Sequence, residues 1–187
     1  MSAPLSPSRV TLHEKHTAPD ACRPMLEQIE KGRGKVPNIF KAMANSPAAL
    51  KAYMGLSGAL KDSALSPRLR EAIALAVTQE VECCYCISAH ALAGKALGMT
   101  PDDIQNARDG KAADAKDQAA LDMALAMIRQ SGNVSDEAFD AARRAGLSEG
   151  EIIDVGVVVA LNLFTSYFNH LVRTPLDFPP APNLPCA

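Results

Sequence analysis

Signals for the start of an α-helix recur along this 187-residue chain. At three of the expected helix starts a serine or threonine is followed directly by proline, and at a fourth a serine lies three residues before a glutamate. The hydroxyl can accept a hydrogen bond from the first turn, proline fits the first helical position, and the glutamate can complete a capping box. The pattern therefore predicts a chain of successive helices. The four starts are Ser46-Pro47, Ser66-Pro67, Thr100-Pro101 and Ser148 with Glu151.

Little in the sequence favours β-structure. Aromatic residues make up only 4% of the chain and tryptophan is absent, whereas strands are enriched in aromatic and β-branched residues. The one β-branched run, from Val155 to Val159, lies inside a segment with a helical start. We therefore predict an all-α fold.

Apolar spacing, together with glycine and proline positions, gives expected bounds for eight helices. The last is the longest and is apolar on nearly all sides, so we expect it at the centre of the fold. We predict an N-terminal arm with a short helix over residues 1–35, a helical domain over 36–178 and a proline-rich tail over 179–187. The expected helices span about residues 24–31, 47–61, 67–81, 83–98, 101–109, 116–130, 135–145 and 148–172.

Charge and hydropathy argue against two classes of partner. Lysine and arginine number 19 and aspartate and glutamate 21, a net charge of −2; without a basic stripe we expect no nucleic-acid binding. The longest uncharged apolar stretch, Val155 to Phe168, has 14 residues, fewer than the roughly 18 that indicate a membrane span. The N-terminus has no apolar core typical of a signal peptide. We predict a cytoplasmic protein with no membrane partner.

Three of the five cysteines fall within four residues, at the start of the segment 83–90. A C-x-x-C in a chain without a signal sequence indicates a redox or metal-binding site rather than a secreted disulfide framework. On a helix, Cys83, Cys86 and His90 would share one face. A helix N-terminus and a nearby base both favour the reactive thiolate. The segment therefore predicts a dithiol that can be oxidised and reduced again.

Glu71 allows two interpretations. It stands ahead of an apolar run, residues 72–77, on the helix expected before the cysteines. It can be an exposed carboxylate that complements the positive end of the helix dipole. It can also be a partly buried carboxylate that faces the dithiol and relays a proton. Periodicity alone favours the exposed carboxylate.

One spacing pattern resembles the core of the alkylhydroperoxidase AhpD-like family, within the carboxymuconolactone decarboxylase superfamily. It consists of Glu71, eleven further residues, and then Cys83-x-Tyr85-Cys86-x-x-x-His90. The resemblance covers roughly residues 36–178. Relatives often carry Asn-Gly before the first cysteine, where this chain has Val81-Glu82, and Cys84 is an extra thiol. Further segments similar to the peroxidase-related branch are Val36–Phe40, Leu65–Glu71 and Phe168–His170.

The resemblance implies a peroxidase that needs neither haem nor metal and that works through a redox-active Cys83–Cys86 disulfide. Cys86 would be the thiolate that attacks the peroxide, and Cys83 the more exposed resolving thiol. His90 and Glu71 would form a proton relay that runs through water. Tyr85 occupies a position that is histidine in one branch of the family. The decarboxylase members of the superfamily lack the dithiol.

The resemblance also implies partners. The substrate would be an alkyl hydroperoxide, and the reductant a dithiol such as a lipoyl or thioredoxin-like protein. The AhpD-like helical fold would assemble into a homo-oligomer, a trimer, hexamer or dimer.

Two alternatives stay open. Cys83, Cys86 and His90, with Cys84 or Glu71, could hold a structural zinc ion, although such sites usually draw ligand pairs from separate segments. The chain could instead be a redox adaptor that passes electrons from its dithiol to a partner, or a helical oligomer without catalysis. An adaptor and a peroxidase need the same thiols, so the sequence does not separate them.

Overall fold

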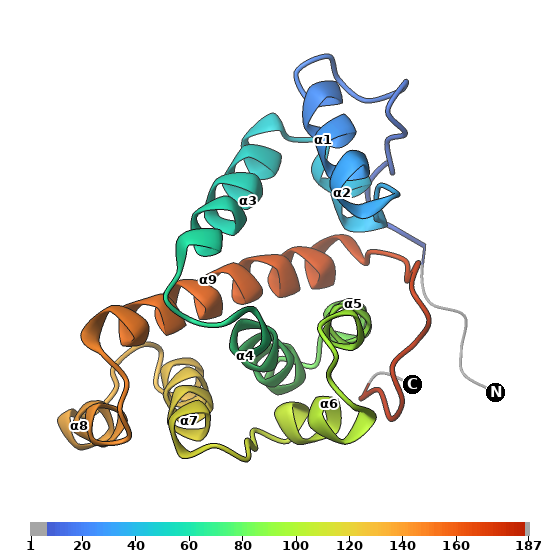
Figure 1. The fold of residues 1–187 in the computed structure, drawn as a ribbon. Coiled ribbons are helices and arrows are strands. Elements are labelled where there is room, and N and C mark those ends of the chain that lie inside the picture. Colours follow the sequence, from blue (N-terminus) through green and yellow to red (C-terminus); the bar gives the residue numbers. More distant parts are fainter. Residues whose placement is uncertain (1–6, 186–187) are drawn as a thin grey trace.

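The computed structural model describes residues 7–185. In this part of the chain there are nine α-helices, one short 3-10 helix and no β-strand (Figure 1). The prediction of an all-α fold is therefore confirmed. The helices are α1 (Arg23–Arg33), α2 (Asn38–Met43), α3 (Pro47–Ala59), η1 (Leu60–Asp62), α4 (Pro67–Glu80), α5 (Cys84–Ala96), α6 (Pro101–Arg108), α7 (Ala115–Arg129), α8 (Asp136–Arg144) and α9 (Glu149–Val172).

The four predicted helix starts are present. Ser46, Ser66, Thr100 and Ser148 each accept a hydrogen bond on the side chain from the backbone N–H three residues further on. These bonds satisfy N–H groups that a helix end otherwise leaves unpaired. The same caps begin α3, α4, α6 and α9, so local sequence sets where the main helices start.

Helix α2 was not predicted. It has six residues and follows Pro37, which provides no side-chain cap. Proline is nevertheless compatible with a helix start, because its ring fixes φ and the N–H that it lacks would be unpaired there. Four of the six residues of α2 are buried, so packing rather than a capping signal accounts for this helix.

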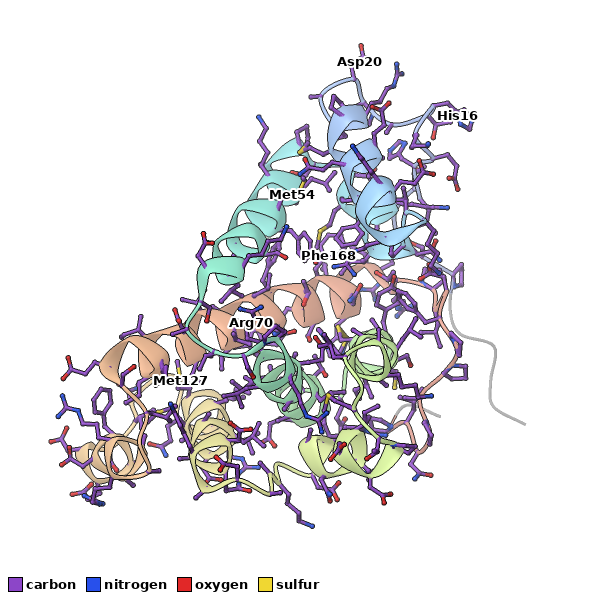
Figure 2. All side chains as sticks on the ribbon, in the orientation of Figure 1. His16, Asp20, Met54, Arg70, Met127 and Phe168 are labelled. Carbon is purple, nitrogen blue, oxygen red and sulfur yellow. A yellow bond between two sulfur atoms is a disulfide. The ribbon has the colours of Figure 1, made fainter. Side chains whose placement is uncertain are left out.

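The long helix α9 lies at the centre of the fold, as predicted (Figure 1). It contacts α4, α5 and α7 on one side and α3 on the other. Side chains fill the space between these helices, and Phe168 of α9 extends toward the N-terminal helices (Figure 2). By length and composition α9 could cross a membrane. The core helix of a soluble protein can have the same length and composition, so this property alone is weak evidence of a membrane span.

Three apolar clusters form the core. The largest joins α4, α7 and α9 around fully buried Ile73, Leu121 and Val155. The second joins α1, α2 and α3, and it includes both cysteines of the C-x-x-C. The third lies beneath α5 and α6. Burial of one aliphatic side chain contributes about 1.5–3 kcal/mol to the free energy of folding. The several buried side chains of the second cluster therefore hold the N-terminal helices against the dithiol.

Both ends of the described chain pack on the helices. In the N-terminal arm the Arg9 N–H donates to the Val172 carbonyl over 2.8 Å. In the tail the buried Arg108 guanidinium donates to the carbonyls of Pro182 and Asn183 over 2.6 and 2.8 Å. The division at residues 35 and 178 stays a prediction, and its outermost parts, residues 1–6 and 186–187, lie outside the described residues.

Candidate active site

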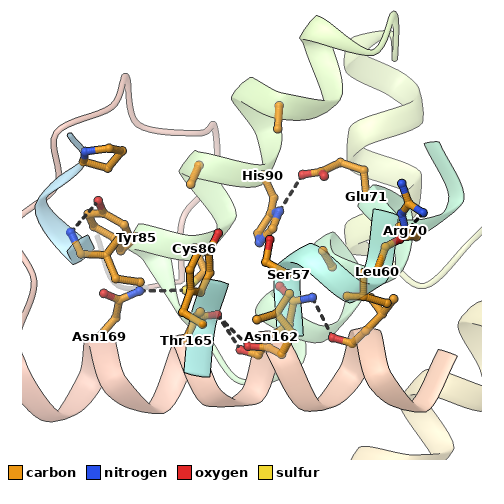
Figure 3. A pocket seen from close by; sticks show the side chains of 18 of the residues that line it. Ser57, Leu60, Arg70, Glu71, Tyr85, Cys86, His90, Asn162, Thr165 and Asn169 are labelled. Atoms are coloured by element: carbon orange, nitrogen blue, oxygen red, sulfur yellow. Dashed lines mark hydrogen bonds and ion pairs between the residues drawn. The ribbon is translucent and has the colours of Figure 1, made fainter. Parts of the chain in front are cut away.

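A pocket of about 300 Å³ opens among α2, α3, α4, α5 and α9. Four of the five predicted site residues line it, namely Glu71, Tyr85, Cys86 and His90, whereas Cys83 does not. Figure 3 shows these side chains above α9, with His90 turned toward Glu71. The fold therefore brings residues from α4 and α5 to one cavity.

Cys83 and Cys86 are joined as a disulfide, and their Cα atoms lie 5.3 Å apart. Cys83 is the N-cap of α5, where its Sγ accepts a hydrogen bond from the Cys86 N–H over 3.3 Å. The turn before it places Glu82 at a φ of 55°. Only glycine adopts this left-handed conformation readily, and other residues lose about 1–2 kcal/mol there.

The prediction that Cys83 is the more exposed thiol is wrong. Cys83 is 1% exposed and Cys86 3% exposed. As the N-cap, Cys83 is packed within the second apolar cluster, beside Ile39 and Phe40 of α2. The two sulfurs differ instead in what they face, because only Cys86 lines the pocket.

Glu71 and His90 form a direct contact. The Glu71 Oε1 lies 2.6 Å from the His90 Nδ1, and the glutamate side chain is only 16% exposed. The interpretation of Glu71 as an exposed partner of the helix dipole is therefore wrong. An ionised carboxylate only accepts hydrogen bonds, so this contact suits the tautomer of His90 that donates from Nδ1 and leaves the lone pair on Nε2.

Tyr85 lies in the pocket wall, but its hydroxyl is engaged elsewhere. It donates to the Asp177 carboxylate over 2.8 Å and accepts from the Ile39 N–H over 3.2 Å. Burial raises the pKa of the Tyr85 phenol, and the bond to Asp177 raises it further, so the hydroxyl stays protonated. It bonds to neither His90 nor Glu71. Tyr85 thus fastens chain segments around the pocket.

Asp177 belongs to a strap, which we define as residues 175–178, that crosses the pocket edge. The Lys35 Nζ lies 3.1 Å from the Asp177 Oδ2, and the Asn38 N–H donates to the same oxygen over 3.3 Å. The Phe178 ring lines the pocket and packs edge-on against the Tyr85 ring at 5.4 Å. The strap was not predicted, because its bonds join residues about 90–140 positions apart.

Two further polar residues reach the sulfurs from α9. The Asn169 Nδ2 lies 3.2 Å from the Cys86 Sγ and the Ser166 Oγ 3.4 Å from it. Both side chains are buried. A signal for them exists in the sequence, because Asn162, Thr165, Ser166 and Asn169 form a polar stripe at helical spacing on an otherwise apolar helix.

Positive charge also gathers at the pocket. Arg33, Lys61 and Arg70 line it. The Arg70 Nη1 donates to the carbonyls of Leu60 and Leu65, which fixes the guanidinium at the end of α3. His170 is exposed and lies outside the lining. Within residues 7–185, no three histidine, cysteine, aspartate or glutamate side chains are grouped to hold a metal ion.

Comparison with known proteins places this geometry among related folds. Residues 47–130 match the carboxymuconolactone decarboxylase family. An uncharacterised peroxidase-related protein with an alkylhydroperoxidase AhpD core from Ralstonia eutropha JMP134 superposes with a TM-score of 0.83 at 24% identity, over 94% of each chain. An uncharacterised peroxidase-related protein from Silicibacter sp. TM1040 superposes at 0.77 with 26% identity, over 98% of this chain and 97% of that one.

The same fold also carries another named activity. The debrominase Bmp8, in complex with 2,3,4-tribromopyrrole, superposes with a TM-score of 0.78 at 21% identity, over 93% of this chain and 94% of that one. At this identity the likeness concerns the fold alone. Among curated proteins, none matches the sequence significantly.

We predict that Tyr85→Phe destabilises the fold without changing thiol chemistry. The variant removes the donor to Asp177 and the acceptor for the Ile39 N–H, which should lower the free energy of unfolding by about 1 kcal/mol. Urea unfolding measures the loss, and Tyr53→Phe, whose hydroxyl accepts from the exposed Arg33, serves as a control with a smaller effect. An unchanged stability combined with a shifted pH profile of cysteine alkylation would return Tyr85 to the proton network.

Proposed function

We propose that this chain, which belongs to the AhpD-like carboxymuconolactone decarboxylase superfamily, is a thiol-dependent peroxidase that reduces alkyl hydroperoxides. The observation that carries the proposal is the position of Cys86, which lines the pocket while paired with Cys83. A small peroxide in the pocket can reach one sulfur, and the second sulfur is within bonding reach to complete the cycle.

The first step uses the dithiol form of the protein. His90 accepts the Cys86 thiol proton at Nε2, and the thiolate attacks the terminal oxygen of the hydroperoxide. The O–O bond breaks, Cys86 becomes a sulfenic acid, and the departing alkoxide receives the proton from His90 and leaves as the alcohol. Glu71 accepts the Nδ1 hydrogen bond throughout, which orients the ring and stabilises its protonated form.

The second step closes the disulfide. The Cys83 thiol attacks the sulfenic sulfur of Cys86, and water leaves. An external dithiol, a lipoyl or thioredoxin-like protein, then restores both thiols and is itself oxidised to a disulfide. Because Cys86 is the sulfur that lines the pocket, we expect this exchange to begin there. The cycle uses no cofactor besides the cysteine pair and suits the reducing cytoplasm.

A homo-oligomer is part of the proposal. Ile153, Tyr167 and Leu171 of α9 are between 60% and 66% exposed, and with exposed Ala160 they follow one helical face. An apolar face of this kind often marks a protein interface.

We predict that the wild-type protein elutes above the monomer mass and that Leu171→Asp lowers the mass. A carboxylate on this face loses its hydration when the copies associate. Gel filtration with light scattering measures both. A monomeric wild-type protein would remove the homo-oligomer from the proposal.

We predict that Cys86→Ser abolishes turnover of tert-butyl hydroperoxide, because it removes the attacking sulfur. Cys83→Ser should allow one oxidation only, trapped at Cys86 as sulfenic acid and detectable by dimedone labelling and mass spectrometry. Cys22→Ser is the control, because this buried thiol lies outside the pocket. Undiminished turnover in both C-x-x-C variants would exclude the dithiol from the reaction.

The same assay separates the alternatives. If the reduced protein consumes hydroperoxide no faster than free dithiol, but a lipoyl protein reduces its disulfide rapidly, the adaptor function replaces the peroxidase. Stoichiometric zinc in the purified protein, by elemental analysis, would favour the structural zinc site instead.

We predict that His90→Ala lowers the peroxidase rate by about 10²-fold or more, the usual contribution of general acid–base catalysis. Glu71→Gln should lower it less, because the amide keeps the contact but loses the charge that stabilises the protonated ring. Glu80→Gln is the matched control on α4, since Glu80 pairs with Arg129 outside the pocket lining. Rates for His90→Ala and Glu71→Gln equal to that of Glu80→Gln would contradict the relay.

A further inference from the structure

Two hydrogen-bond donors from α9 converge on the sulfur of Cys86. The Asn169 Nδ2 lies 3.2 Å from the Cys86 Sγ, and the Ser166 Oγ lies 3.4 Å from it. Ser166 is 0% exposed and Asn169 4% exposed, so water does not compete for either donor. Figure 3 shows the Asn169 amide directed at Cys86 from below the pocket.

The environment of Asn169 sets it apart from its neighbours on α9. The Asn169 Oδ1 is buried, and no hydrogen-bond partner for it is present among the described residues. By contrast, Asn162 donates to the Val158 carbonyl and Thr165 to the Leu161 carbonyl of their own helix. The only bonds of the Asn169 side chain are therefore those from Nδ2 to the two sulfurs. An orphaned buried group of this kind is a mark of a functional site.

The helix end alone would favour the other cysteine. Cys83 is the N-cap of α5, and its sulfur accepts the Cys86 N–H over 3.3 Å. That N–H and the positive end of the helix dipole stabilise a thiolate at Cys83. Asn169 acts in the opposite direction, because its Nδ2 is 3.2 Å from the Cys86 Sγ and 4.0 Å from the Cys83 Sγ.

We propose that Asn169, assisted by Ser166, stabilises the Cys86 thiolate and so makes Cys86 the attacking sulfur despite the helix-end advantage of Cys83. A neutral thiol or disulfide sulfur is a weak acceptor, whereas a thiolate is a charged one, so both bonds strengthen when Cys86 ionises. This inference rests on the proposed function, because it concerns which thiol of the peroxidase dithiol reacts.

Other titratable and charged groups line the same pocket as Cys86, and the variants below leave them in place. Their influence on Cys86 is common to the wild-type protein and each variant, so a difference between the two isolates the amide. These groups, besides Cys83 itself, are Arg33, Lys61, Arg70, Glu71, Tyr85 and His90.

The test is the pH dependence of alkylation at Cys86. It is measured on the full reduced chain carrying Cys83→Ser, with iodoacetamide as the probe and tandem mass spectrometry to assign the modified cysteine. Asn169→Leu should raise the apparent pKa of Cys86 by about one unit or more, the size expected for loss of a charge-assisted hydrogen bond. Ser166→Ala should raise it by less. Asn162→Leu, the same substitution about two turns earlier on the same face of α9, should leave it unchanged.

The outcomes are decisive in both directions. Circular dichroism and gel filtration test whether each variant is folded. If Asn169→Leu is not folded, Asn169→Asp and Ser166→Ala decide. A carboxylate near the sulfur in Asn169→Asp should raise the apparent pKa of Cys86 further. An unchanged Cys86 titration in a folded Asn169 variant overturns the inference. A shift in Asn162→Leu as large as in Asn169→Leu also overturns it, because it would show a general packing effect.

The inference and the proposed function fail separately. If the titration shifts as expected but the wild-type protein does not consume hydroperoxide, Asn169 stabilises a thiolate with another task and the peroxidase is wrong. If hydroperoxide is consumed but the titration is unchanged, the peroxidase stands and the role of Asn169 is wrong.

Discussion

The packing of the first turn of α5 against α9 is the contact on which the site depends. It buries both sulfurs of the C-x-x-C and sets the polar stripe of α9 against one of them. Both sulfurs belong to the apolar cluster of the N-terminal helices, but only Cys86 lines the pocket. A dithiol that is nearly symmetric in sequence thereby becomes asymmetric in space. In the proposed cycle, the different roles of the two sulfurs follow from this asymmetry rather than from a difference in exposure.

Around this contact, α4 and the strap at residues 175–178 help to complete the pocket. α4 provides Glu71, which fixes the ring of His90 through its Nδ1. The strap at residues 175–178 closes one edge of the pocket through Asp177. Its carboxylate accepts a hydrogen bond from the Tyr85 hydroxyl and pairs with the Lys35 ammonium. The clustering of polar groups at this one place, inside a fold held by apolar packing, is typical of active sites, where strain and buried polarity are offset by stability elsewhere.

Local signals in the sequence predicted much of the fold and less of the site. Caps such as Ser66 and Ser148 act over three residues, so the helices they begin could be placed closely. Helix α2 has no such cap and forms through burial, which a local pattern does not reveal. Likewise the bonds of Asn169 to Cys86 and of Tyr85 to Asp177 join residues more than 80 positions apart. Helical spacing predicted that Cys86 and His90 share a face, but not that Cys83, as an N-cap, would be buried.

The central claim is that Cys86 and Cys83 together reduce a hydroperoxide. Rapid mixing of the fully reduced wild-type protein with one equivalent of tert-butyl hydroperoxide, followed by acid quench, tests it most directly. We predict one Cys83–Cys86 disulfide and one tert-butanol formed per peroxide consumed, far faster than with free dithiol. Peroxide loss at the rate of free dithiol, or alcohol formed without that disulfide, would contradict the account.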